Sequence, residues 1–169
     1  MKRPIAVRSY QAGDEVALWD VFFSAVRVTA RRDYSQVQVE AWAPDSPDPE
    51  RWKERIAGIA PCVASIDGRI VGYADVQADG YIDHFFVAAE FARQGVGSEL
   101  MRVIHQTARE QVILKLYSDV SLTARPFFEH WGFTVEALQT VTVRGVELTN
   151  MRMSKRLDRD ASDALFYQR

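Results

Sequence analysis

The spacing of apolar side chains predicts short strands and helices in the first third of the chain. Residues 5–9 form the first predicted strand. Beyond it, apolar residues recur at near-helical spacing, which predicts a helix with Asp14 as its N-cap. A second helix is predicted at 35–41, and Pro49 suits the first turn of a third helix that ends near Ile59.

From residue 61 the apolar pattern changes to an extended one. Asp-Gly pairs, which favour the positive φ angles of hairpin turns, occur at 67–68 and 79–80. They separate predicted strands at 62–66, 69–76 and 81–87. We therefore expect a three-stranded antiparallel unit in this part of the chain.

The second half of the chain continues the alternation of helices and strands. Apolar residues after Gly97 mark one face of a helix of about three turns. The elements predicted after this helix are a central strand at 112–117, a second helix at 123–131, and a final hairpin of 133–143 and 146–153. Gly132 tolerates the left-handed geometry that ends the second of these helices.

Composition and charge describe one ordinary globular domain. The chain has 169 residues, of which 47% are apolar and 26% are charged, and this balance excludes a disordered or coiled-coil chain. The formal charge is −2, and basic residues form only short clusters such as Arg31-Arg32. The sequence therefore argues against a nucleic-acid partner.

Cysteine usage and the absence of long apolar segments indicate the compartment. Cys62 is the single cysteine, so an internal disulfide is impossible and no Cys/His cluster for a metal exists. The first residues meet a charge before an apolar signal region can form, and no segment approaches the roughly 20 apolar residues of a membrane span. We expect a cytoplasmic protein without a metal site or a membrane partner.

A glycine-rich stretch at 91–98 lies between a predicted strand and a predicted helix. Such a turn leaves backbone N–H groups unpaired at a helix N-terminus, where they suit phosphate oxygens. Gly95 and Gly97 permit close approach, and Arg93 adds a cation. A dinucleotide fingerprint needs a third glycine where this chain has Leu100, and a Walker loop needs a Gly-Lys-Ser/Thr that is absent.

Two motifs in this order resemble those of the GNAT acetyltransferases. Residues 93–98 match the pyrophosphate loop of motif A, written Gln/Arg-x-x-Gly-x-Gly/Ala, although Ala92 stands where Gln or Arg is usual. Residues 121–133 resemble motif B, written Asn-x-x-Ala-x-x-Phe/Leu-Tyr-Glu-x-x-Gly-Phe. Ser121 replaces the usual Asn and Phe128 replaces the usual Tyr.

The resemblance implies an α/β fold. The GNAT fold has a mixed, mostly antiparallel sheet of about seven strands flanked by helices and splayed between strands four and five, as the resemblance implies. We expect the acetyltransferase domain at 1–157 and a polar C-terminal tail at 158–169. Acetyl-CoA is the implied acyl donor. The implied cofactor-binding residues are Phe85, Phe86, Val87, Arg93, Gln94, Gly95, Val96, Gly97, Ser98, Ser121, Ala124, Phe127 and Phe128.

The resemblance also implies catalytic roles for residues on the strands. Asp83 stands where GNAT enzymes often carry a Glu that accepts the amine proton; the alternative is an ordinary strand carboxylate. Strand alternation directs His84 to the opposite face unless a bulge intervenes. A backbone N–H from 85–87 is expected to meet the charge on the thioester oxygen. Phe128 has no proton to give, so Tyr117 is the replacement candidate for the acid, with a buried core tyrosine as the alternative.

The sequence gives only general indications of the acceptor and of the oligomeric state. In this family the first helices build the acceptor pocket, here about 30–56, where Tyr34, Trp42 and Trp52 favour a compact amine or merely pack the helices. A small-molecule or peptide amine is the expected acceptor. A non-catalytic acyl-CoA sensor and an unrelated phosphate-binding domain are the competing hypotheses. An apolar edge at 141–153 suggests a homodimer.

Overall fold

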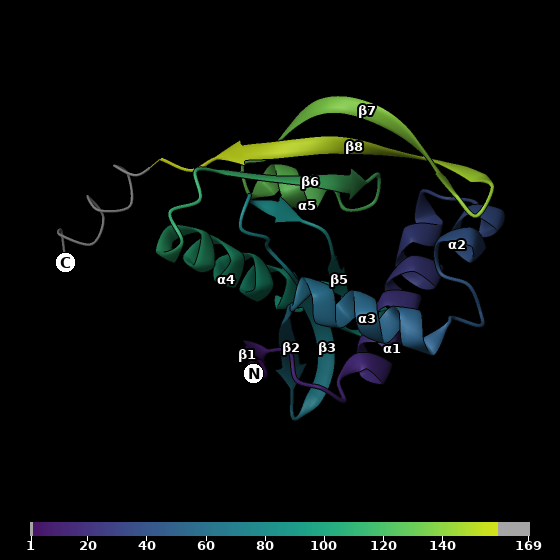
Figure 1. The fold of residues 1–169 in the computed structure, drawn as a ribbon, viewed down its shortest axis with the longest axis horizontal. Coiled ribbons are helices and arrows are strands. Elements are labelled where there is room, and N and C mark those ends of the chain that lie inside the picture. The colour runs from purple at the N-terminus through teal and green to yellow at the C-terminus, as the bar shows by residue number, and fades with distance from the viewer. Residues whose placement is uncertain (1, 159–169) are drawn as a thin grey trace.

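The computed structural model describes residues 2–158, so most of the predicted C-terminal tail lies outside the described residues. The described chain forms two four-stranded sheets with helices around them (Figure 1). The strands are β1 (Ala6–Ser9), β2 (Cys62–Ile66), β3 (Arg69–Ala74), β4 (Tyr81–Ile82), β5 (Phe85–Val87), β6 (Lys115–Ser121), β7 (Thr134–Val143) and β8 (Val146–Arg156). The helices are α1 (Glu15–Ser24), α2 (Gln36–Trp42), α3 (Pro49–Ile59), α4 (Val96–Glu110) and α5 (Arg125–His130).

The two sheets part within the strand predicted at 81–87. Its first half, β4, pairs in parallel with β6, and its second half, β5, pairs antiparallel with β3. The strand orders are β1-β2-β3-β5 and β4-β6-β8-β7. The α/β class and the splayed sheet are confirmed. The expectation of three antiparallel strands holds for β2, β3 and β5, and it is wrong for β4, which pairs in parallel.

The position of β8 inside the upper sheet of Figure 1 corrects the prediction that 141–153 offers an edge for a homodimer. The predicted hairpin of β7 and β8 is confirmed, with Arg144 and Gly145 at positive φ in its turn. Within the described residues, however, β8 has β6 on one side and β7 on the other. Its backbone N–H and C=O groups are therefore occupied, and only β7 offers a free edge within the range 141–153.

Local chemistry explains where the helices begin. Ser35 forms a capping box with Gln38 at the start of α2, and the Asp48 carboxylate accepts two N–H groups in the first turn of α3, where Pro49 needs no acceptor. Asp14 is the N-cap residue of α1, as predicted, but its side chain makes no capping hydrogen bond. Its carboxylate instead accepts hydrogen bonds from the Arg8 guanidinium, at 2.8 and 3.0 Å.

The strand predicted at 112–117 begins three residues later and ends at Ser121. Val112 adopts a left-handed φ of 58° because it closes α4, with the N–H of Ile113 donating to the carbonyl of Ala108 at 2.8 Å. Val112 and Leu114 are exposed, whereas Ile113 and Leu116 are buried. The apolar run therefore belongs partly to a helix end and not entirely to a strand.

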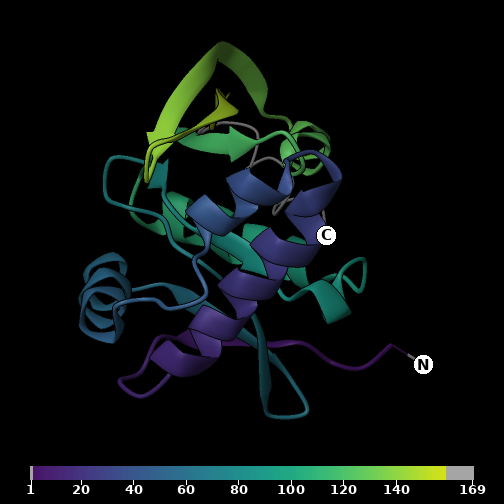
Figure 2. The same ribbon diagram turned by 90° about the vertical axis from the view of Figure 1, so that its right-hand side faces the viewer.

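Helices cover opposite faces of the lower sheet. On β3, Gly72 faces Val96 and Leu100 of α4, and on the adjoining β5 Phe86 contacts Phe22 of α1, with ring centroids 4.9 Å apart. Figure 2 shows α1 and the turns after it leading from the lower sheet toward the upper one. These layers enclose one core. Among residues 2–158, no helix combines the length and the apolar character that crossing a bilayer requires.

Gly80, directly before β4, packs against the backbone of β6 in the same sheet. A Cβ atom on Gly80 would lie 1.9 Å from the carbonyl oxygen of Lys115, and the Gly80 carbonyl accepts the N–H of Tyr117 at 3.1 Å. Its φ of +90° is also in the region that disfavours side chains. Glycine is therefore required at this position for two separate reasons.

We predict that Gly80→Ala lowers the free energy of unfolding by about 3 kcal/mol or more, because the positive φ and the collision with Lys115 both add cost. Gly68→Ala is the matched control: Gly68 also has a positive φ, at +77°, but nothing lies near its missing Cβ. It should cost only about 1 kcal/mol. Urea titration monitored by tryptophan fluorescence measures both, and equal losses would contradict the collision.

Candidate functional site

Two cavities adjoin where the sheets part. The first encloses about 330 Å³ between β5, the start of α4, the start of α5 and the π-helical turn Ala25–Thr29 after α1. The second encloses about 430 Å³ between α3, β4 and the strands β6 to β8. Trp42, Phe86 and Ser121 line both cavities. A molecule in each would therefore meet the other at this common wall.

The start of α4 supplies the polar end of the first cavity. Arg93 and Gly95 both have positive φ, at 61° and 89°, which turns the chain sharply into α4. Within residues 2–158, the amides of Val96, Gly97 and Ser98 have no hydrogen-bond acceptor. A helix N-terminus carries about half a positive charge, so this end of the cavity is suited to an anion.

Cations and close packing reinforce this polar end. Arg93 and Arg32 line the cavity, and the Lys2 ammonium lies 3.5 Å from where a Cβ on Gly95 would be. At Gly97, a Cβ would lie 3.2 Å from the Phe127 ring, so glycine allows α5 to pack over the first turn of α4. The loop at 93–98 is thus open to a ligand, and its packing against α5 fixes its position.

Most of the residues predicted to hold the donor gather at the first cavity. Ten line it: Phe85, Phe86, Val87, Arg93, Gly95, Gly97, Ser98, Ser121, Ala124 and Phe127. The side chains of the other three are directed elsewhere. Gln94 donates to the carbonyl of Glu90, Val96 is buried against β3, and Phe128 is 2% exposed among core rings including Phe133.

Sequence reasoning missed residues that come from the segment between α1 and α2. Thr29 and Arg32 line the first cavity although they lie more than 50 residues before β5. The Arg31-Arg32 pair was visible only as a short basic cluster. The π-helical turn at Ala25–Thr29 was not predicted, and such turns are common at functional sites.

The backbone of β5 presents unpaired groups to the first cavity. The N–H of Asp75, one residue past β3, donates to the carbonyl of His84 at 3.1 Å, and the N–H of Ala88 donates to the carbonyl of Val71 on β3 at 2.8 Å. In an antiparallel ladder alternate residues direct their hydrogen-bonding groups to the same side, so the N–H groups of Phe85 and Val87 point away from β3. Within the described chain β5 has no strand on that side, and both N–H groups face the gap between the sheets.

Asp83 and His84 lie on the same cavity, which corrects the expectation from strand alternation. Both line the second cavity because the strand breaks between β4 and β5. The Asp75 carboxylate holds this break: its Oδ1 accepts the N–H of Asp83 at 3.0 Å and the N–H of His84 at 2.6 Å. A break in the strand, and not a bulge, therefore allows both residues to line one cavity.

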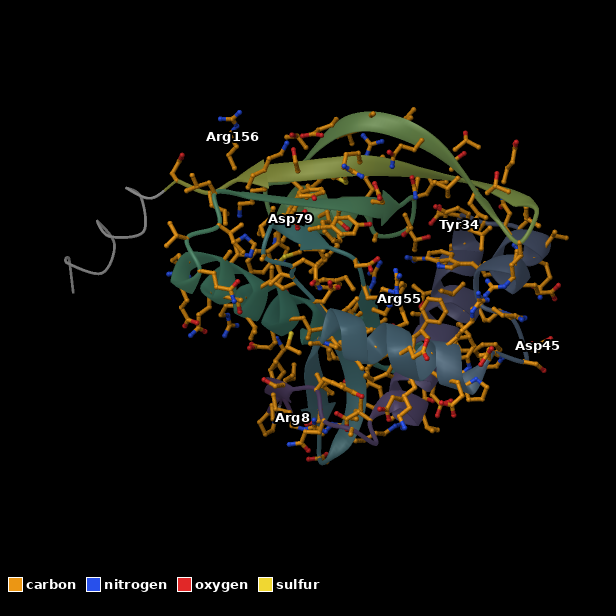
Figure 3. All side chains as sticks on the ribbon, viewed as in Figure 1. Arg8, Tyr34, Asp45, Arg55, Asp79 and Arg156 are labelled. Carbon is orange, nitrogen blue, oxygen red and sulfur yellow. The ribbon has the colours of Figure 1, made fainter. Side chains whose placement is uncertain are left out.

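Burial fixes the protonation of the groups around the break. Asp75 is 2% exposed, and burial raises the pKa of its carboxyl to about 6. Burial lowers the pKa of His84 to about 4, so its imidazole is neutral at pH 7, with Nδ1 2.9 Å from the Tyr73 hydroxyl. Asp83 pairs with Arg55 of α3, with Oδ2 2.7 Å from Nη2. Arg55 extends from α3 toward the upper sheet (Figure 3).

Other predicted residues are divided between the site and the core. Tyr34 and Trp42 line the second cavity, whereas Trp52 donates its indole N–H to the Glu15 carbonyl and packs among core rings. Tyr117 lines neither cavity. Its hydroxyl donates to Asp79 at 2.5 Å, and this contact raises the pKa of Tyr117. Residues 2–158 contain no group of three or more His, Cys, Asp or Glu placed to hold a metal.

Comparisons with known proteins agree on one family. A family model described as an acetyltransferase (GNAT) domain matches residues 30–155. The chain is 39% identical over 149 residues to YafP of Escherichia coli K12, an uncharacterized N-acetyltransferase, covering 88% of this chain and 94% of that protein.

Solved structures share the fold. A GCN5-related N-acetyltransferase from Rhodopseudomonas palustris superposes with a TM-score of 0.88 at 28% identity, covering 93% of this chain and 98% of that one. The protein yncA from Salmonella typhimurium, solved with its cofactor acetyl-CoA, has a TM-score of 0.68 at 19% identity, covering 94% of this chain and 96% of that one.

The raised pKa of the Asp75 carboxyl predicts that the free energy of unfolding depends on pH. Its neutral form stabilises the fold below about pH 4, and this contribution is lost as the pH rises through about 6. Asp75→Asn cannot titrate but keeps an oxygen that accepts both N–H groups. From about pH 4 to about pH 7, the unfolding free energy of the wild type should therefore fall by about 2 kcal/mol relative to that of the variant.

Urea titrations at a series of pH values measure this difference. Asp75→Leu removes the acceptor as well, and it should be less stable than Asp75→Asn at every pH because two buried N–H groups lose their partner. A wild-type-to-Asn difference that stays constant across the range would refute the titration of a buried Asp75.

Proposed function

The chain belongs to the GNAT acetyltransferase family, and we propose that it transfers the acetyl group of acetyl-CoA to a primary amine held in a ternary complex. The proposal is carried by the two cavities that meet at Trp42, Phe86 and Ser121. The first would take the donor and the second the acceptor. The relative from Salmonella typhimurium solved with acetyl-CoA supports this choice of donor. We place the acetyltransferase domain at 1–157.

The diphosphate of the donor would lie on the start of α4. The amides of Val96, Gly97 and Ser98 supply hydrogen-bond donors, and Arg93 and Arg32 supply positive charge. The acyl arm would then run along β5 toward the common wall. Its amide groups can pair with the free edge of that strand, as a further strand would.

The thioester carbonyl would be polarised by the backbone of β5. The N–H groups of Phe85 and Val87 point into the gap, where one of them can meet the negative charge that develops on the carbonyl oxygen. A backbone donor fixed by the ladder to β3 needs no reorganisation during the reaction. This agrees with the expectation from the sequence for 85–87.

Asp83 is the proposed proton acceptor. The amine nitrogen attacks the carbonyl carbon, a proton passes to the Asp83 carboxylate directly or through water, and the C–S bond breaks. Phe128 is buried and Tyr117 bonds to Asp79, so neither protonates the leaving group in this scheme. The thiolate leaves as the anion, which an ordinary thiol pKa of about 8.5 permits.

Ser98→Asp tests the donor site without weakening the helix. An aspartate in the first turn of α4 stabilises the helix dipole but repels phosphate. We expect its affinity for acetyl-CoA to fall on the order of 10- to 100-fold, and the loss to shrink as salt is added. Ser98→Asn, of the same size but uncharged, should lose much less. Calorimetry measures both, and equal affinity of the Asp and Asn variants would place the diphosphate elsewhere.

Asp83→Asn tests the proposed base. With any amine that the wild type acetylates, kcat/KM should fall on the order of 100-fold, with a larger deficit in acid than in alkali, where more of the amine is already deprotonated. Asp67→Asn, in the distant β2–β3 turn, is the matched control. Thiol release from acetyl-CoA is the readout. An unchanged pH profile would remove Asp83 from this role, and acetyl-CoA binding without thiol release by the wild type would indicate a sensor.

A further inference from the structure

The second cavity has no unoccupied carboxylate. Its acidic residues within residues 2–158 are Asp83, paired with Arg55, and Asp119, which accepts from Arg152 at 2.8 Å. Asp119 also accepts from Tyr81 and Gln139, at 3.1 and 2.8 Å. Both carboxylates are already paired, so this cavity offers no further anion for an acceptor with several positive charges.

Guanidinium donors, in contrast, remain available in this cavity. Arg144 donates one N–H to the carbonyl of Ala41 at 2.7 Å and pairs with no carboxylate among the described residues. Arg55 makes one hydrogen-bonded ion pair among the described residues, to Asp83, and its side chain is 54% exposed. Arginine presents five N–H donors, so both side chains can still bind a planar anion.

We infer that the acceptor is a free α-amino acid with an apolar side chain, an assignment that rests on the proposed acetyltransferase function. The Arg55–Asp83 pair places a cation and an anion 2.7 Å apart. An α-amino acid carries an ammonium and a carboxylate on one carbon, so it matches this pair with the charges reversed. Its ammonium binds Asp83, and its carboxylate binds Arg55, with Arg144 as a second cation on the cavity wall.

The exposures of the pair set the orientation of the acceptor. Asp83 is 19% exposed and lies next to the break at β5, whereas Arg55 is 54% exposed. The amine therefore enters toward the common wall and the carboxylate stays toward solvent. This places the nitrogen, and not the carboxylate, next to the thioester.

The rest of the cavity wall has an apolar part beside polar groups, of which Asp119 is already paired with Arg152. Phe22, Tyr34, Trp42 and Phe86 present rings, and Leu148 and Val141 add aliphatic surface from β7 and β8. Burying an apolar side chain of leucine or phenylalanine size contributes about 1.5–3 kcal/mol. A polar or charged side chain gains nothing comparable against these rings, so the apolar part of the wall favours apolar amino acids.

The reaction balances with these groups alone. The ammonium gives one proton to the Asp83 carboxylate, which passes it to solvent. The amine lone pair forms the C–N bond while the C–S bond breaks and the thiolate leaves as the anion; the second amine proton then neutralises the released thiolate. The products are an N-acetyl amino acid and free coenzyme A, and no other reactant is needed.

The experiment compares each amino acid with its amide, which keeps the amine and the side chain but lacks the carboxylate. The full chain is first titrated with coenzyme A by calorimetry. The saturated protein is then titrated with L-phenylalanine and L-phenylalaninamide, and with L-leucine and L-leucinamide. We expect each acid to bind about tenfold or more tightly than its amide, because the bidentate contact to Arg55 is charge-assisted.

Variants then assign the preference to a residue. Arg55→Gln should reduce the acid-to-amide ratio to within about threefold, while Arg51→Gln, the same change on an exposed position of α3, should leave it intact. With acetyl-CoA in place of coenzyme A, thiol release should rank the acids and amides in the same order.

Each remaining outcome overturns a defined part of the argument. Amides that bind as well as the acids, a ratio that survives Arg55→Gln, or no binding of either acid to coenzyme A-saturated protein would refute the amino acid assignment while leaving acetyl transfer standing. Failure to bind coenzyme A in the first titration would instead refute the proposed function itself.

Discussion

The carboxylate of Asp75 holds the chain at the point where the two sheets part. It is buried, and one of its oxygens accepts the N–H groups of both Asp83 and His84. Without an acceptor these buried N–H groups would favour a continuous strand, in which alternation separates the two side chains. The break directs both into the second cavity and frees the edge of β5 for the first. Both halves of the site thus depend on one buried acceptor.

Helices and the turns before them build the remaining walls of the two cavities around this break. The start of α4 contributes unpaired amides at one end of the first cavity, and the packing of Phe127 against Gly97 fixes α5 beside them. At the other side, the Tyr34 hydroxyl accepts the N–H of Leu122 at 3.0 Å and donates to the carbonyl of Thr149 at 2.5 Å. This pair of bonds ties the turn before α2 to the upper sheet, so Trp42 is held where the cavities meet.

The parts of the site that local chemistry determines were predictable from the sequence. Gly95 and Gly97 mark a backbone that must turn sharply and approach closely, and this requirement is visible in the residue types. The orientation of Asp83 and His84 was not predictable, because it depends on Asp75, which lies on another strand. Phe128 and Tyr117 were assigned from their positions along the chain, which do not give the direction of a side chain: Phe128 is buried in the core, and the Tyr117 hydroxyl bonds to Asp79.

The two cavities share a wall formed by Trp42, Phe86 and Ser121. Binding in one cavity is therefore coupled thermodynamically to binding in the other. A side chain that shifts to admit one molecule reshapes the space offered to the other. Whatever factor the first occupant applies to the affinity of the second, the second must apply to the first. Any adjustment of these three side chains to one substrate therefore changes the dissociation constants of both substrates by the same factor.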